Sequence, residues 1–312
     1  MPSPWTHIKV SKLRRMTRGR RALLFCALMI PSVILMLVLL GLQRSYLIEA
    51  DTGLVQLELQ GTNAWSLRDV TICTPRERPD RSAVATPGEA CSAFDQEMRV
   101  EPSLTLAWLD DTPAVLRAEA GPNGPRLRIM LPAGLGDTHA PGTEIVVGSG
   151  STSPIGALLF SGEAVLGTVL GSGERYFLHS ATWEARQTSW ATRALRSSTE
   201  KVMTGEALRG AELSVVERYG EGWRPAMVFG HLTLSPADEE KVPSLSVTVV
   251  SEPGSTELQI GHYGLADASR IRPDLFDTTA TSVLLIAAIA FLSLASAATQ
   301  LVGDLMSAGR DA

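Results

Sequence analysis

A pair of cysteines is the feature of this sequence whose spacing points most directly to a covalent bond. Cys73 and Cys91 lie 18 positions apart, and the polar segment between them carries three prolines, so few of its side chains can hold it in place. A disulfide there would stabilise the fold by about 3 kcal/mol in the chain-entropy account, and it requires an oxidising compartment. A metal pair is the alternative, although no histidine or further cysteine stands nearby in the sequence. We therefore expect a Cys73–Cys91 disulfide and no metal site.

No short enzyme motif occurs in the chain. The sequence lacks a Gly-x-Ser-x-Gly elbow, a phosphate-binding glycine loop and a His-Glu-x-x-His zinc motif. The residue types that remain available for catalysis stand in segments typical of turns and strand ends. They are Ser149, Ser151, Ser153, His139, His179, His231, His262, Asp110, Asp111 and the acidic residues 238–240. A catalytic site would need several of these distant residues to converge, so we assign no catalytic residue and expect no cofactor.

Two apolar runs near the ends of the chain determine where any site would lie. Residues 22–42 and 282–302 are each 21 long and contain no Asp, Glu, Lys or Arg. At about 1.5 Å per residue, a helix of that length crosses a hydrocarbon core of about 30 Å. We expect cytoplasmic tails at 1–21 and 303–312, transmembrane helices at the two runs, and an exported domain at 43–281. A cleaved signal peptide is the alternative for the first run, but that run is longer than a signal core and no small-x-small site follows it.

Basic residues before the first run set the expected orientation. This segment has no acidic residue, and its cations are Lys9, Lys12, Arg14, Arg15, Arg18, Arg20 and Arg21. Short segments rich in Lys and Arg stay in the cytoplasm, where they also suit anionic lipid headgroups, so both termini are expected there. The 24 arginines against 4 lysines, and an exported domain without an Asn-x-Ser/Thr acceptor, favour a GC-rich bacterium. The expected location is the bacterial inner membrane, with the main domain in the periplasm.

The charge of the exported part argues against one class of partner. The chain has a net charge of −5, the N-terminal tail carries +7, and the residues between the two tails carry −11. An acidic domain of this kind is unsuited to binding nucleic acid or a polyanionic glycan over a broad face. The expected partners are the lipid bilayer, other membrane or periplasmic proteins and a second copy of the chain, with no nucleic acid among them.

The second apolar run has a stripe of small residues. Ala290, Ser293 and Ala297 follow the spacing i, i+3 and i+7, which places them on one face of a helix. Small residues allow helices to approach closely in lipid, where apolar contact alone gives no driving force. We expect this face to pack on the first span, on a second copy or on a partner. An alanine-rich composition from a GC-rich genome is the alternative explanation.

The exported domain is predicted to be β structure. Short alternating or β-branched runs are separated by Gly, Pro, Asp and Ser throughout 43–281, a pattern typical of a sandwich or barrel. The segment 188–203 is the best candidate for a helix, or else the connector between two halves of the domain. The expected fold class is therefore mainly β: an all-β, sandwich-like or barrel-like extracytoplasmic domain between two transmembrane α-helices.

These features favour a non-enzymatic inner-membrane protein whose periplasmic β domain scaffolds or positions envelope components. Two alternatives stay open. A membrane-anchored enzyme acting on an envelope polymer would assemble its site from distant residues. A periplasmic sensor would work through a membrane partner, because the two short tails hold no output domain.

Overall fold

The computed structural model describes residues 43–61, 64–80, 89–148, 156–168, 177–188, 200–235, 242–262, 265 and 267–273, together with 290, 293, 294 and 297. Residues 43–187 and 201–274 form one compact unit, which we call the β unit.

The described residues of the β unit and its borders form sixteen strands, and every pairing with a defined register is antiparallel. The first eight are β1 Gln43–Thr52, β2 Leu54–Leu59, β3 Ala64–Pro75, β4 Gln96–Ala107, β5 Thr112–Gly121, β6 Gly124–Leu131, β7 Thr143–Gly148 and β8 Leu158–Leu166. The others are β9 Leu178–Thr188, β10 Glu200–Ala207, β11 Glu212–Tyr219, β12 Gly222–Pro225, β13 Val228–Leu234, β14 Leu245–Ser251, β15 Thr256–Gly261 and β16 Ser269–Ile271.

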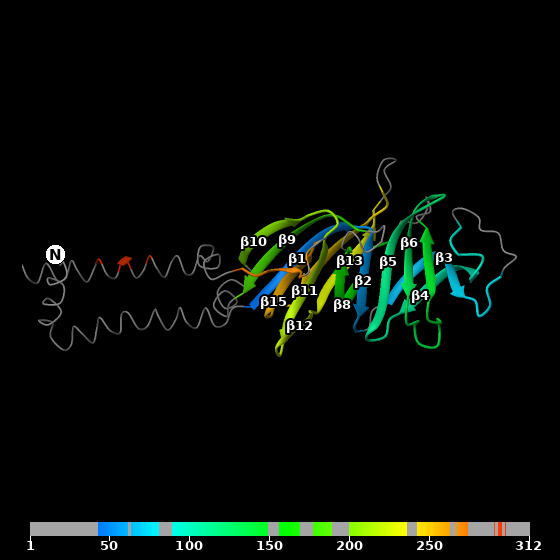
Figure 1. Ribbon diagram of the computed structural model, residues 1–312, viewed down its shortest axis with the longest axis horizontal. Coiled ribbons are helices and arrows are strands. Elements are labelled where there is room, and N and C mark those ends of the chain that lie inside the picture. The colour runs from blue at the N-terminus through cyan, green and yellow to red at the C-terminus, as the bar shows by residue number, and fades with distance from the viewer. Residues whose placement is uncertain are drawn as a thin grey trace, which may run out of the picture. The chain divides into compact units, whose positions relative to one another are not determined.

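Alternation of buried and exposed side chains explains why these segments are strands. In β5, β6 and β14 every second side chain is buried, which is the period of a strand with one face on a core. The main path of the sheet runs β10-β9-β1-β14-β13-β8-β2-β5-β6-β7-β3-β4, and β11, β12, β15 and β16 branch from it through β8 (Figure 1). The prediction of a mainly β domain is confirmed, as one large branched sheet.

The sheet winds back onto its own starting segment. Only Gly53 separates β1 from β2 in the chain, yet β14, β13 and β8 lie between these two strands in the sheet. The amide of Gly53 donates to the carbonyl of Phe177 at 3.0 Å, and its own carbonyl accepts from the amide of Ala118 at 3.1 Å. Crossing the sheet from β1 through β14, β13 and β8 to β2 therefore leads back to the chain segment around Gly53.

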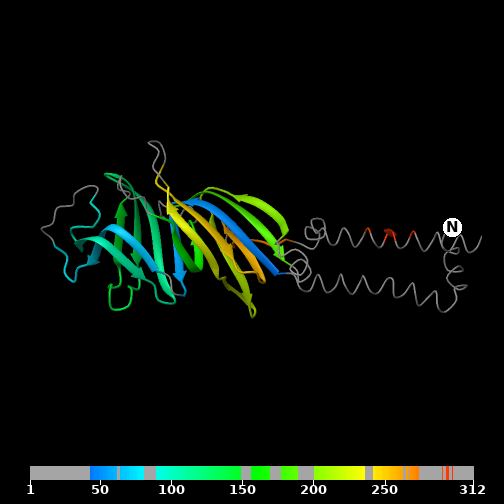
Figure 2. The same ribbon diagram turned by 180° about the vertical axis from the view of Figure 1, so that it is seen from behind.

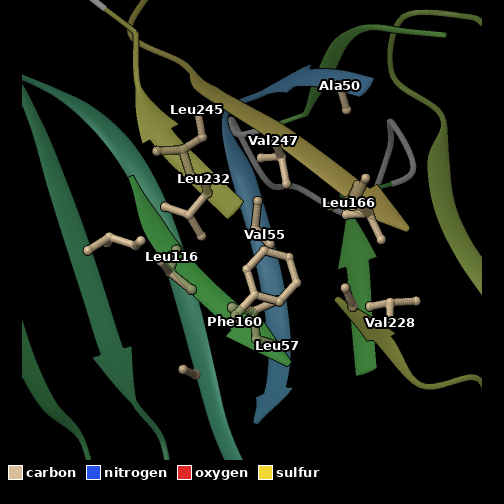
Figure 3. Close-up of a cluster of buried hydrophobic side chains, with 14 of the residues drawn as sticks. Ala50, Val55, Leu57, Leu116, Phe160, Leu166, Val228, Leu232, Leu245 and Val247 are labelled. Carbon is tan, nitrogen blue, oxygen red and sulfur yellow. The ribbon is translucent and has the colours of Figure 1, made fainter. Parts of the chain in front are cut away.

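Buried apolar side chains fill the space inside this winding. Val55, Phe160 and Val247 gather there from three strands (Figure 3). Gly230 on β13 leaves room for the aromatic ring, because a Cβ at that position would lie 2.6 Å from Phe160 Cζ and 2.4 Å from the carbonyl oxygen of Thr248. The core therefore depends on a residue without a side chain at this point.

β8 is the branch point of the sheet. The first part of β8 pairs with β13, whereas Val165 and Leu166 near its end pair with both β2 and β11. The strand also accepts a hydrogen bond from the far arm of the main path, since Trp65 Nε1 on β3 donates to the carbonyl of Leu159 at 2.6 Å. The ring of Trp65 packs edge-on against Trp108, with centroids 4.7 Å apart. The bond from Trp65 to Leu159 therefore fastens the β3 arm of the sheet to β8.

The candidate helix at 188–203 is wrong at both of its ends. Thr188 is the last residue of β9, and Glu200–Met203 belong to β10. β9 and β10 are neighbours in the sheet, so pairing between strands satisfies their backbone groups. Residues 189–199 lie outside the described part of the chain.

The predicted membrane spans stay predictions. Within the described residues, no helix is both long enough and apolar enough to cross a bilayer. The two apolar runs and the basic N-terminal tail lie outside these residues, except for Ala290, Ser293, Leu294 and Ala297, whose backbone is helical and whose side chains are exposed.

Candidate functional site

The first and last strands of the β unit are fastened to each other. Tyr46 on β1 is fully buried, and its hydroxyl donates a 2.8 Å hydrogen bond to the carbonyl of Ile271 on β16. Arg44 exchanges two backbone hydrogen bonds, of 2.9 and 2.8 Å, with Gly254 between β14 and β15. Both views show the blue start of β1 beside the orange end of the unit (Figures 1 and 2). We call this end the base; its residues are Arg44, Tyr46, Trp223, Glu257, Arg270, Ile271 and Arg272.

Positive charge predominates among the contacts at the base. Arg272 lies 3.6 Å from the buried carboxylate of Glu257. Arg44 is half-buried, and burial followed by the charge of Arg272 lowers its pKa. Its Nε is buried without a hydrogen-bond partner in the described part of the chain. Burial raises the pKa of Tyr46 to about 12, so its hydroxyl remains a donor at neutral pH.

Aromatic rings lie beside arginines on the adjoining β11–β12 hairpin. The guanidinium carbon of Arg270 lies 4.7 Å from the ring centroid of Trp223. On the same hairpin, Arg224 lies 4.3 Å from the ring centroid of Tyr219 and donates to Glu217 at 2.7 Å. The side chain of Tyr219 is 65 % exposed. Amphipathic rings beside cations are typical of surfaces that meet a partner or a layer of lipid headgroups.

The predicted disulfide is confirmed. Cys73 and Cys91 are joined, with their Cα atoms 5.4 Å apart. Both cysteines are buried and pack with Val146 of the neighbouring strand β7. The bond therefore holds the end of the segment between β3 and β4 against the sheet.

An ion-pair network that is not apparent from the sequence lies next to the disulfide. Arg128 on β6 donates to Glu119 on β5 at 2.8 Å, to Glu144 on β7 and to the carbonyl of Ala90 at 2.9 Å. Burial alone would lower the pKa of Arg128, but hydrogen bonds and charge from Glu119 and Glu144 outweigh it and raise that pKa. The hydrogen bond from Arg128 to the carbonyl of Ala90 holds the residue that precedes Cys91 in place. Its sequence signal is an arginine and two glutamates on adjacent strands, which becomes visible only when the register is known.

The residues considered for catalysis have separate surroundings. His139 lies in the turn after β6, where burial lowers its pKa and Glu101 acts against that shift. His231 on β13 stands opposite Leu159 and Thr248. His262 follows β15, and the serines at 149–153 and the acidic residues 238–240 lie outside the described residues. Among the residues that are described, no cluster of three His, Cys, Asp or Glu side chains could hold a metal ion.

His179 has a polar neighbourhood that the sequence did not reveal. Burial lowers its pKa, the charge of Asp51 opposes that shift and Arg209 adds to it. The imidazole packs edge-on against Phe177 at 5.2 Å, and Arg209 lies 4.9 Å from the same ring. His179 Nε2 and Asp51 Oδ1 are buried without hydrogen-bond partners in the described regions. A histidine near a carboxylate can move protons, so this is the place where chemistry would be sought first.

Acidic residues face each other between β2 and β8. Glu58 stands directly opposite Glu163, and Asp110 accepts a hydrogen bond from the amide of Gly61 close by in the chain. Burial, and then the charge of Glu58, raise the pKa of Glu163. Like charges directly opposite each other destabilise a pair of strands, so this pair lowers stability locally.

Comparison with family models, with curated proteins and with solved structures gives no match for this chain.

Proposed function

We propose that this chain is an inner-membrane protein, anchored by helices at 22–42 and 282–302, whose periplasmic β unit scaffolds or positions envelope components without catalysing a reaction. The observation that carries the proposal is the hydrogen bond between Tyr46 and Ile271. It joins the two ends of the β unit, so the chain leaves the unit toward both apolar runs from one place. Two adjacent helices entering one bilayer need such an arrangement.

The disulfide supports the exported location. Disulfides form and persist in oxidising compartments such as the periplasm and are rare in the cytosol. Cys73–Cys91 is enclosed by packing and by the contacts of Arg128, so it is a structural bond. This agrees with the basic N-terminal tail, which favours a cytoplasmic N-terminus and an exported domain.

The edge strand β4 supports the scaffold role. β4 ends the main path and, among the described strands, is paired with β3 alone. Most of its twelve residues are exposed, including Met98 at 60 % and Val100 at 67 %. A long edge strand with exposed apolar side chains is suited to contact with another chain.

A photo-crosslinking residue at Val100 tests the scaffold role in intact membranes. Leu159 on β8 is a matched control, because it is 66 % exposed but lies within the sheet. We expect a reproducible set of envelope-protein adducts from position 100 and none of these from position 159. Equal or absent adducts at the two positions would contradict the proposal.

The enzymatic alternative has its own test. The full-length protein would have to turn over an envelope polymer and lose that activity on a single substitution such as His179→Gln or Asp51→Asn. That result would replace the scaffold role with the anchored enzyme, because His179 Nε2 and Asp51 Oδ1 are buried polar atoms without hydrogen-bond partners among the described residues.

A further inference from the structure

In the sequence, the base begins just after the end of the first predicted span. Gln43 is the first residue of β1, and it follows directly on the apolar run that ends at Leu42. Arg44 is two residues past that end, which is at most about 7 Å of extended chain. A headgroup layer is about 5–8 Å thick, from the difference between the whole bilayer and its hydrocarbon core. With the first span in place, no linker is left to carry the base away from the lipid surface.

Contacts within the base connect Trp223 to the start of β1. Tyr46 ties β1 to Ile271, the residues on either side of Ile271 are Arg270 and Arg272, and Arg270 stacks on the ring of Trp223. Both flanking arginines are exposed, whereas the carboxylate of Glu257 that meets Arg272 is buried. The exposed groups of the base are therefore guanidiniums beside an aromatic ring.

We propose that the base docks on the outer leaflet, with Arg270 and Arg272 binding lipid phosphate groups and Trp223 lying at the headgroup level. This inference rests on the proposed membrane anchoring. Guanidinium groups bind phosphate oxygens through paired hydrogen bonds, and tryptophan favours the boundary between lipid and water. The stack of Arg270 on Trp223 presents the two groups together.

Fluorescence quenching in lipid nanodiscs tests the docking. Full-length protein lacking Trp5 and Trp190 is placed in nanodiscs whose acyl chains carry bromine close to the headgroup. We expect bromine to quench part of the emission, and Trp223→Phe to abolish that quenching. Trp108→Phe is the control, since this residue is buried against Trp65, and it should leave the quenching unchanged. Persistent quenching in the Trp223→Phe variant, or none in the parent, would overturn the inference.

A second pair of variants separates the arginines from the fold. Arg270→Gln with Arg272→Gln should reduce the quenching of Trp223, whereas Arg99→Gln on the exposed edge strand β4 should not. Unchanged quenching in the double variant would contradict the assignment of the phosphate ligands. Failure of the chain to enter nanodiscs would refute the membrane anchoring itself, whereas entry with an unquenched Trp223 would refute only the docking.

Discussion

Tyr46 and Ile271 lie 225 positions apart in the chain and are joined by a 2.8 Å hydrogen bond from the tyrosine hydroxyl to the backbone carbonyl. The tyrosine ring is fully buried, whereas Ile271 is half-buried. It unites the first and last strands of the β unit and thereby the two chain segments that lead toward the apolar runs.

Replacement of Tyr46 by phenylalanine tests this joint. The variant keeps the ring but leaves the carbonyl of Ile271 without its donor, so we expect a loss of about 1 kcal/mol of unfolding free energy. Hydrogen exchange should become faster in β16. Tyr219→Phe is the control, because that side chain is mostly exposed. Equal stability of the two variants would contradict a structural role for the bond.

Removal of the disulfide tests the exported location and the fold together. Cys73→Ser with Cys91→Ser should lower the unfolding free energy by about 3 kcal/mol. Reductant should destabilise the wild-type protein by a similar amount in urea titrations and leave the double variant unaffected. A wild-type protein purified from membranes with two free thiols at these positions would contradict the account.

Arg128 should be the most sensitive residue of the ion-pair network. Arg128→Met removes the cation that the largely buried carboxylates of Glu119 and Glu144 share, although Arg126 stays 3.3 Å from Glu119. We expect a loss of about 2–3 kcal/mol. Arg99→Met removes a mostly exposed arginine and should change stability by less than about 0.5 kcal/mol. Chemical denaturation of both variants measures the difference, and equal losses would show that the network has no special role.

Glu163→Gln should stabilise the protein at neutral pH. The folded state holds the pKa of Glu163 above its ordinary value of 4.5, so the folded state binds this proton more tightly than the unfolded state does. The side chain therefore favours folding below pH 4.5, and this contribution is lost as the pH rises through the raised pKa.

The expected gain from Glu163→Gln at pH 7 is about 0.5 kcal/mol, as for relief of a like-charge pair across two strands. The gain should shrink as the pH falls toward 4, and it should be smaller in a Glu58→Gln background because Glu58 is the opposing charge. Thermal denaturation between pH 4 and 7 measures it. A gain that is independent of both pH and Glu58 would contradict this explanation.

Strands with one buried face were predictable from sequence, and strands without that pattern were not. In β14 burial alternates with a period of two, and apolar and polar residues alternate in the sequence in the same way over 245–249. β4 is exposed on both faces for most of its length, so its burial lacks the alternation that marks a strand with one face on a core. In β9 the buried positions include Ala181, Ala185 and Gln187, whose low hydrophobicity concealed the strand.

The candidate site was predictable only in part. The disulfide could be inferred because Cys73 and Cys91 are the two cysteines outside the apolar runs. The joint between Tyr46 and Ile271 depends on how the sheet winds through Gly53, and the network around Arg128 depends on the register of three strands. Local patterns carry neither kind of information.

Thiol labelling of spheroplasts tests the central claim, that the β unit and the two termini lie on opposite sides of a membrane. In a Cys26→Ala background, single cysteines replace Met98 on β4, Ser3 or Ser307. We predict that a membrane-impermeant maleimide labels position 98 in intact spheroplasts and labels positions 3 and 307 only after permeabilisation. Labelling of position 3 or 307 without permeabilisation, or protection of position 98, would contradict the account.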